Sequence, residues 1–331
     1  MKQAKWVSAL FITTAVGVGV GVGVPASAAV AATLPQVAAG FGLSQGVSVG
    51  GTLTAPASYS VAGLKALPQT TFAVPARGGA PAHADQGVSL EQLVETSAPV
   101  LPAAKNALLR VLVTVTPIAG LPVTFALGEL DPSFGNHPAY VVVSQDGRAP
   151  LLAPELVVPG DSSDARTVIG VRQITVAVEN PPASTPAHAG DLKIDAGLFT
   201  TVLTAAQLAA LPAQTVHVQF TAGGPSPQTH TEVGPTLDEV LAAAHIPPTI
   251  VSWVAGVGSD DYVATVTPAE AHVGGRPLLI STSEDGIPQV QPRLVTDGDV
   301  KGGRYDSGLV DLVVGYPSYL SFLGLGSPLP W

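Results

Sequence analysis

The segments Gly87-Val-Ser-Leu-Glu-Gln-Leu-Val94 and Gly234-Pro-Thr-Leu-Asp-Glu-Val-Leu241 decide the fold of this 331-residue chain. Each starts with glycine, reaches a hydroxyl residue and then enters an apolar pattern typical of a helix. The hydroxyl residue and the amide or acid three positions later match a capping box, which satisfies the first free amides of a helix. The paired residues are Ser89 with Gln92 and Thr236 with Glu239. Two helix starts of one design indicate an internal repeat.

Further blocks recur in the same order on both sides of the chain. Ser60–Pro68 and Thr204–Pro212 each predict a short helix with a hydroxyl cap and a proline stop, followed by strands ending at Val74 and Phe220. Apolar runs before an Asp-Gly pair predict strands that lead into tight turns. The remaining matched blocks are Gly120–Gly147 with Ser259–Gly286, Pro154–Asp161 with Pro292–Asp299, and Val168–Val178 with Ser307–Val314.

The repeat sets the expected domain organisation. We predict a signal peptide at 1–28, an N-terminal lead at 29–57, a first domain at 58–180, a linker at 181–199, a second domain at 200–316 and a C-terminal tail at 317–331. The linker prediction follows from its richness in Pro, Ala and Ser. The prolines of the apolar tail favour a docking segment over a membrane helix.

The N-terminus has the pattern of a secretory signal. Lys2 and Lys5 precede an apolar run, which ends at the small residues Ala26-Ser27-Ala28. We therefore expect Sec-type export with cleavage after Ala28, to the outside of the cell or the cell envelope. A retained membrane anchor is the alternative, because the apolar run is nearly long enough to span a bilayer.

Charge and composition exclude several classes of function. The net charge is −10, and removal of the two signal lysines makes it more negative, so nucleic acid and anionic lipid are poor partners. The chain has no cysteine, which excludes disulfides, a cysteine nucleophile and a thiolate metal ligand. With 36 glycines, 31 prolines and only 11% charged residues, it is typical of a strand-rich folded protein.

In order and spacing, the matched blocks resemble the molybdopterin-binding domain of the sulfite-oxidase-like family. The segments that carry the resemblance are Leu127-Gly-Glu-Leu-Asp-Pro132 and Val157-Val-Pro-Gly-Asp161 in the first half, and Gly274-Gly-Arg-Pro277 and Arg293-Leu-Val-Thr-Asp-Gly-Asp299 in the second. The resemblance covers most of residues 58–316. It implies an α+β fold: two tandem sulfite-oxidase-like molybdopterin-binding-fold domains with mixed β-sheets and short helices.

The chain departs from the family at the position that carries its chemistry. Active members bind molybdenum through a cysteine thiolate, and the matching stretches here, 74–87 and 220–234, contain His83 and His230 instead. Imidazole is a poor substitute for a soft thiolate on this metal. The signal also lacks the twin arginines that export of a cofactor-loaded protein requires. The anionic pterin would need several cations, and the matched loops contain only Arg166, Lys301 and Arg304. We therefore expect no cofactor and no metal.

Seven residues are candidates for ligand binding. They are His83, His230, Arg166, Arg304, Lys301, Asp161 and Asp299. The histidines are expected in Gly/Pro-rich loops, where each ring either faces a ligand or braces its loop through backbone hydrogen bonds. If the rings are braces, replacing either by alanine would cost about 1–3 kcal/mol. The two Gly-Asp loops with their arginines form either anion sites or loops closed by salt bridges, and the second interpretation is favoured.

Three weaker patterns are set aside. Asp297, Asp299 and Asp306 faintly suggest a calcium loop but lack its closing glutamate. Gly42-Leu-Ser-Gln-Gly46 matches a serine nucleophile elbow outside the required strand and helix. Glu270 and His272 form an acid–histidine pair that nothing matches in the first half.

We therefore predict an exported, non-catalytic binding or scaffold protein, whose partner is a small molecule or an envelope protein. The alternative is a molybdopterin-dependent oxidoreductase with an atypical metal site, and a hydrolase using the histidine loops is weaker. Because a fold does not carry its activity once the reactive residue is gone, the function has to be argued from the site.

Overall fold

The computed structural model describes residues 46–317, apart from 149–153, 183, 223, 225 and 274. The proposed signal peptide, residues 42–45 of the serine motif and the tail from 318 onward lie outside these residues. In the part of the chain that is described, none of the helices has the length and apolar character needed to span a membrane.

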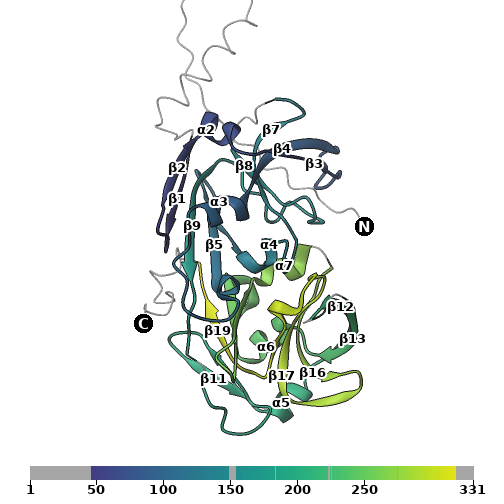
Figure 1. The fold of residues 1–331 in the computed structure, drawn as a ribbon. Helices are drawn as coiled ribbons and strands as arrows, with labels where there is room; N and C mark the ends of the chain where they lie inside the picture. The colour runs from purple at the N-terminus through teal and green to yellow at the C-terminus, as the bar shows by residue number, and fades with distance from the viewer. Residues whose placement is uncertain are drawn as a thin grey trace, which may run out of the picture. The chain divides into compact units, whose positions relative to one another are not determined.

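The first half of the described chain contains two sheets. A five-stranded mixed sheet has the order β2-β1-β9-β5-β6, and a four-stranded antiparallel sheet has the order β3-β4-β7-β8. Figure 1 shows β1 beside β9, with which it pairs in parallel. The strands of the first sheet are β1 (Gly46–Gly51), β2 (Ala57–Ser60), β5 (Val111–Pro117), β6 (Val123–Ala126) and β9 (Val171–Val178). Those of the second are β3 (Thr70–Val74), β4 (His83–Ser89), β7 (Tyr140–Gln145) and β8 (Glu155–Val157).

The second half contains two sheets with corresponding strand orders. The mixed sheet runs β11-β10-β19-β14-β15, with β10 parallel to β19, and the antiparallel sheet runs β12-β13-β16-β17-β18. The strands of the mixed sheet are β10 (Leu192–Asp195), β11 (Thr200–Leu203), β14 (Trp253–Gly258), β15 (Val263–Val266) and β19 (Leu309–Gly315). Those of the antiparallel sheet are β12 (Gln214–Thr221), β13 (Pro227–Gly234), β16 (Leu278–Glu284), β17 (Ile287–Thr296) and β18 (Asp306–Ser307).

Two strands lie in segments that the sequence suggested were connections. β1 precedes position 58, yet it pairs with β2 and β9. β10 lies within 181–199, yet it pairs with β11 and β19. The mixed sheet of each half therefore takes one of its central strands from the segment that leads into it.

The prediction of an α+β fold is wrong, because the described chain is mainly β-sheet. Its α-helices are short, and the longest have seven residues. Prolines soon after the helix ends prevent longer helices, while the runs rich in Val and Thr between them favour strands. The helices are α2 (Val61–Ala66), α3 (Leu90–Thr96), α4 (Leu127–Leu130), α5 (Ala205–Ala209), α6 (Leu237–Ala243) and α7 (Pro268–Val273), with 3₁₀ turns η1 (Ala107–Arg110), η2 (Pro248–Ile250) and η3 (Gly302–Arg304).

The predicted helix starts are present, with one difference in capping. Thr236 and Glu239 form the full reciprocal box at α6. Ser89 caps α3 by accepting from the backbone amide of Gln92, and its hydroxyl donates to Glu91. The second contact of a capping box, from the Ser89 backbone amide to the Gln92 side chain, is missing. The α3 start is therefore held by one cap bond where α6 has two.

Each half has its own apolar core, and a third core joins the halves. The two large cores lie between the mixed sheet, the antiparallel sheet and the short helices of each half. The junction core combines Leu112 and Ala177 of the first half with Trp253, Val263 and Val313 of the second. This apolar contact fixes the two mixed sheets against each other and positions the loops described next.

Candidate functional site

The predicted Asp161–Arg166 loop is closed by a buried ion cluster. Arg166 donates through Nε and Nη2 to the two carboxylate oxygens of Asp161, at 2.9 and 2.7 Å. Its Nη1 donates to both oxygens of Glu129, at 2.7 and 2.9 Å. Arg166 is 1% exposed, so this guanidinium is committed to two carboxylates inside the protein.

The Asp299–Arg304 loop has the same arrangement. Arg304 donates to Asp299 at 2.8 and 2.6 Å, and to Glu270 at 3.0 and 2.8 Å. It too is 1% exposed. Burial acts to lower the pKa of Arg304, but the adjacent Asp299 and Glu270 outweigh burial and raise the pKa above its ordinary value.

Glu129 is the acid that sequence reasoning missed. It lay inside a quoted motif, but an ungapped alignment of Gly120–Gly147 with Ser259–Gly286 placed Pro268 opposite Glu129 and Asp131 opposite Glu270. The contacts pair Glu129 with Glu270, because each binds the Nη1 of the arginine in its own half. Both follow a short strand, β6 or β15, at the start of a short helix, and a shift of two residues relative to the ungapped alignment hid this equivalence.

The two clusters are linked by residues of both halves. Arg276 donates to Glu129 at 3.3 Å, across the junction. His137 lies close to Arg276, Arg304 and Arg166, and burial first and these three charges next lower its pKa to about 3. His137 is therefore neutral at physiological pH, and the linked clusters form a charged core shared by both halves.

The two candidate histidines lie in strands, which corrects the expectation that they occupy loops. His83 is in β4 and pairs with Val74, whereas His230 is in β13 and pairs with Val218. His83 Nε2 is 3.6 Å from Asp85, and His230 Nδ1 is 2.9 Å from Asp285. Each histidine contacts an acid of its own half, and His83 Nδ1 also lies 3.1 Å from the Pro81 carbonyl, which is the kind of backbone contact that the bracing interpretation predicts.

We expect unequal stability losses when the two histidines are replaced in the full chain. Asp85 is 1% exposed and both its oxygens lack a hydrogen-bond partner, so His83 is its nearest counter-charge. His83→Ala should lower the free energy of unfolding by about 1–3 kcal/mol. His230→Ala should change it little, because Asp285 is half exposed and remains solvated.

Urea unfolding of the full chain measures both changes. His188→Ala, at an exposed position, is the matched control. Equal losses for His83→Ala and His230→Ala would contradict this interpretation of the two environments.

The remaining sequence candidates do not converge. Lys301 and Asp306 line one hollow at the surface of the second half, whereas Asp299 is bound to Arg304. Asp299 and Asp306 therefore do not share a ligand site. Within the described ranges, no three or more His, Asp or Glu side chains group in a way that suits a metal ion.

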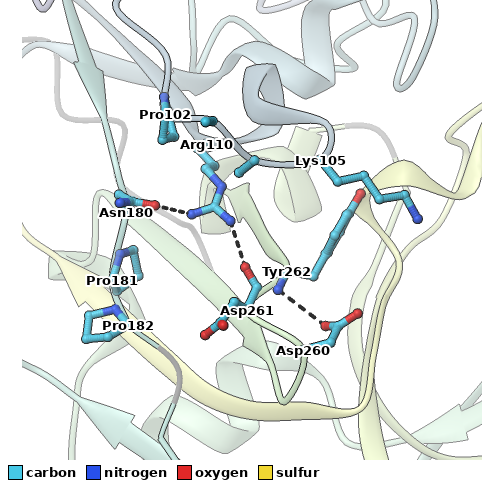
Figure 2. Close-up of a pocket in the computed structure, with 11 residues that line it drawn as sticks. Pro102, Lys105, Arg110, Asn180, Pro181, Pro182, Asp260, Asp261 and Tyr262 are labelled. Atoms are coloured by element: carbon cyan, nitrogen blue, oxygen red, sulfur yellow. Dashed lines mark hydrogen bonds between the residues drawn. The ribbon is translucent and has the colours of Figure 1, made fainter.

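A polar groove lies at the junction of the halves, and we call it the junction groove. It consists of two adjoining hollows of about 560 and 520 Å³ that share Lys105, Asp260 and Tyr262. Figure 2 shows the first hollow, in which the Arg110 guanidinium bridges the side chain of Asn180 and the backbone carbonyl of Asp261. This bridge joins the halves and closes one end of the groove.

Tyr262 forms the wall between the two hollows. Its hydroxyl accepts from Asn106 at 2.9 Å and donates to the Gly303 carbonyl at 2.5 Å. Lys105 Nζ lies 5.8 Å from the centre of its ring, which is a cation–π contact. The described residues that line the groove include no histidine and no cysteine. The groove therefore offers a rigid aromatic wall with charges of both signs, which suits binding.

The residues present do not fit molybdopterin. The chain has no cysteine for the metal. Arg166 and Arg304 are saturated by buried carboxylates, and each cluster carries two acids for one arginine. A multiply anionic ligand would have to displace these carboxylates and then lie beside them. Lys301 alone of the predicted cations remains available at the surface.

Comparisons with known proteins give distant structural likenesses. Neither a protein-family model nor a curated protein matches the sequence. Among solved structures, the chain is similar to the sulfane dehydrogenase SoxCD from Paracoccus pantotrophus, with 12% identity and a TM-score of 0.32. The match covers 81% of this chain and 78% of that one.

Proposed function

We propose that this chain is a non-catalytic binding protein that holds a small polar ligand, or a polar group of a partner protein, in the junction groove. The observation that carries the proposal is the saturation of Arg166 and Arg304 by internal carboxylates. The sequence resembles the sulfite-oxidase-like family, and the charged residues at the positions where that family binds its cofactor thus form internal ion pairs in this chain. Export from the cytoplasm is part of this proposal and rests on the N-terminal sequence pattern.

The groove supports a binding function by its construction. Lys105 and Lys301 supply positive charge, Asp260 and Asp261 supply negative charge, and Tyr262 supplies an aromatic face. Hydrogen bonds across the junction hold this wall in place before any ligand arrives, which lowers the entropic cost of binding. The described lining residues include no histidine and no thiolate, and the hydroxyl of Ser307 accepts from Arg293, an arrangement that supports recognition.

The test is the molybdenum and pterin content of the protein purified from a host that makes molybdopterin. We expect both to be far below one equivalent per chain, because the thiolate ligand is missing and the arginines are occupied. A cysteine-containing sulfite-oxidase-like enzyme, produced in the same host, shows that the cofactor supply is adequate. Stoichiometric molybdenum and pterin, with electron transfer to an acceptor dye, would overturn the proposal in favour of an oxidoreductase.

A further inference from the structure

Asp306 is a buried acid without a partner. It is 1% exposed, and neither carboxylate oxygen has a hydrogen-bond partner among the described residues. Leaving a carboxyl group in this state costs stability, because it has lost its hydrogen bonds to water and has made none within the protein. The group lines the second hollow of the junction groove.

The fold does not require an acid at this position. In the first half, Val168 occupies the matching place, two residues after Arg166 as Asp306 is two residues after Arg304. Val168 pairs with Leu156, and Asp306 pairs with Leu294. Val168 is buried and apolar. A structural role alone therefore leaves the carboxyl group of Asp306 unexplained.

Asp260 faces the same small space as Asp306. A Cβ atom added to Gly258 would lie 2.7 Å from Oδ1 of Asp306 and 2.8 Å from Oδ1 of Asp260. The missing side chain of Gly258 thus lets both carboxylates approach the same point of its backbone, so the two acids lie close together. The Tyr262 amide donates to Asp260 Oδ1 at 3.3 Å, which fixes that carboxylate beside the aromatic ring (Figure 2).

The surroundings favour an organic cation over a metal ion. Calcium takes six to eight oxygen ligands, whereas two carboxylates meet here. Aromatic rings next to carboxylates are a setting that binds ammonium and guanidinium groups. Phe134, Tyr262 and Tyr305 line this hollow, and the buried hydroxyl of Tyr305 also lacks a hydrogen-bond partner.

We propose that the second hollow binds a guanidinium or primary ammonium group between Asp260 and Asp306, against the ring of Tyr262. The inference rests on the proposed binding function and names the chemical class of the ligand. The source of the group is a free small cation or a basic side chain of a peptide, and the chemistry of recognition is the same for both.

Binding is coupled to proton release. Burial, and then the charge of Asp260, raise the pKa of Asp306 to about 8, so that it holds a proton at neutral pH in the free protein. The titratable groups around it are Asp260 and Tyr262 from the β14–β15 turn, with Lys105 and Lys301 lining the same hollow. A bound cation favours the ionised carboxylate, so affinity should rise with pH up to about 8.

Calorimetric titration of the full chain tests the inference. The probe is N-acetyl-arginine amide, and its control is N-acetyl-citrulline amide, which has a similar shape and no charge. We expect saturable binding of the arginine compound only, with an affinity about tenfold higher at pH 7.5 than at pH 6.5. Methylguanidinium and a capped Gly-Gly-Arg-Gly-Gly peptide separate the two sources: binding of the peptide alone assigns a side chain as the ligand, and binding of both assigns the cationic group itself.

Variants assign the binding to the carboxylates. Asp306→Val copies the first half and should lower affinity by about tenfold or more, and it should remove the pH dependence. Asp260→Asn should also weaken binding. Glu95→Gln is the matched control: it removes one negative charge at an exposed position of α3 outside the groove, and should retain affinity within about twofold.

Two outcomes would overturn the inference. One is equal binding of the arginine and citrulline compounds, or no binding of any cationic probe at millimolar concentration. The other is unchanged binding in Asp306→Val. Either result leaves the non-catalytic function standing if molybdenum and pterin are absent, so failure of this inference and failure of the proposed function are distinguishable.

Discussion

Replacing Arg304 by methionine should lower the free energy of unfolding by about 3–5 kcal/mol, because it strands Glu270 and Asp299 as buried acids without a counter-charge. These acids are 2% and 1% exposed and receive four hydrogen bonds from Arg304. Methionine keeps the apolar stem of the side chain and removes the guanidinium, so the loss reports mainly the missing charge and its hydrogen bonds. Urea unfolding at neutral pH measures it.

Arg166→Met gives an internal comparison. Its loss of unfolding free energy should be smaller than that of Arg304→Met, because Glu129 keeps the contact with Arg276 at 3.3 Å after Arg166 is removed. Arg172→Met, at an exposed position, should change stability by less than about 0.5 kcal/mol. If Arg304→Met were as stable as Arg172→Met, the buried ion cluster of the second half would not stabilise the fold as described.

Asp306→Asn should remove a pH dependence of stability. The pKa of Asp306 rises from 3.8 to about 8 on folding, so between these values the folded state binds the proton that the unfolded state has lost. Stability therefore falls as pH rises through this window, by up to about 1.4 kcal/mol per pH unit. The variant should be the more stable protein at pH 8, by roughly a few kcal/mol, and similar to the parent at pH 4.

The measurement is the unfolding free energy of parent and variant from pH 4 to 9. Glu91 and Glu179, whose pKa values burial raises to about 7, titrate in both proteins and cancel in the difference. A difference that does not grow with pH would refute the buried neutral acid. If Asp306→Asn is more stable than the parent and yet fails to bind the cation, the loss of binding cannot be due to unfolding.

Local patterns in the sequence predicted the local structure. The hydroxyl caps at Ser60, Ser89, Thr204 and Thr236 start helices, because a cap involves residues only three apart. Asp161 with Arg166 and Asp299 with Arg304 are also local pairs, and their salt bridges follow from five-residue spacing. The fold class was wrong because it followed from the resemblance to a family, whereas the composition, rich in Gly and Pro and with runs of Val and Thr, was typical of a strand-rich protein.

Contacts between distant residues could not be predicted in this way. Glu129 reaches Arg166 across 37 positions, and Arg110 reaches the Asp261 carbonyl across 151. Nothing in the neighbouring sequence of either residue specifies such a partner. Asp306 was noticed only as part of an aspartate run, and its isolation depends on packing that brings Gly258 and Asp260 against it.

The junction core limits how this chain can be divided. Trp253 and Val313 of the second half are packed against Leu112 and Ala177 of the first. A cut in the connection between β9 and β10 would leave each half with an apolar face that its own residues do not cover. For protein engineering, the smallest transferable unit is therefore the pair of halves. A graft or truncation that contains one half alone would expose an apolar surface that favours association with other molecules.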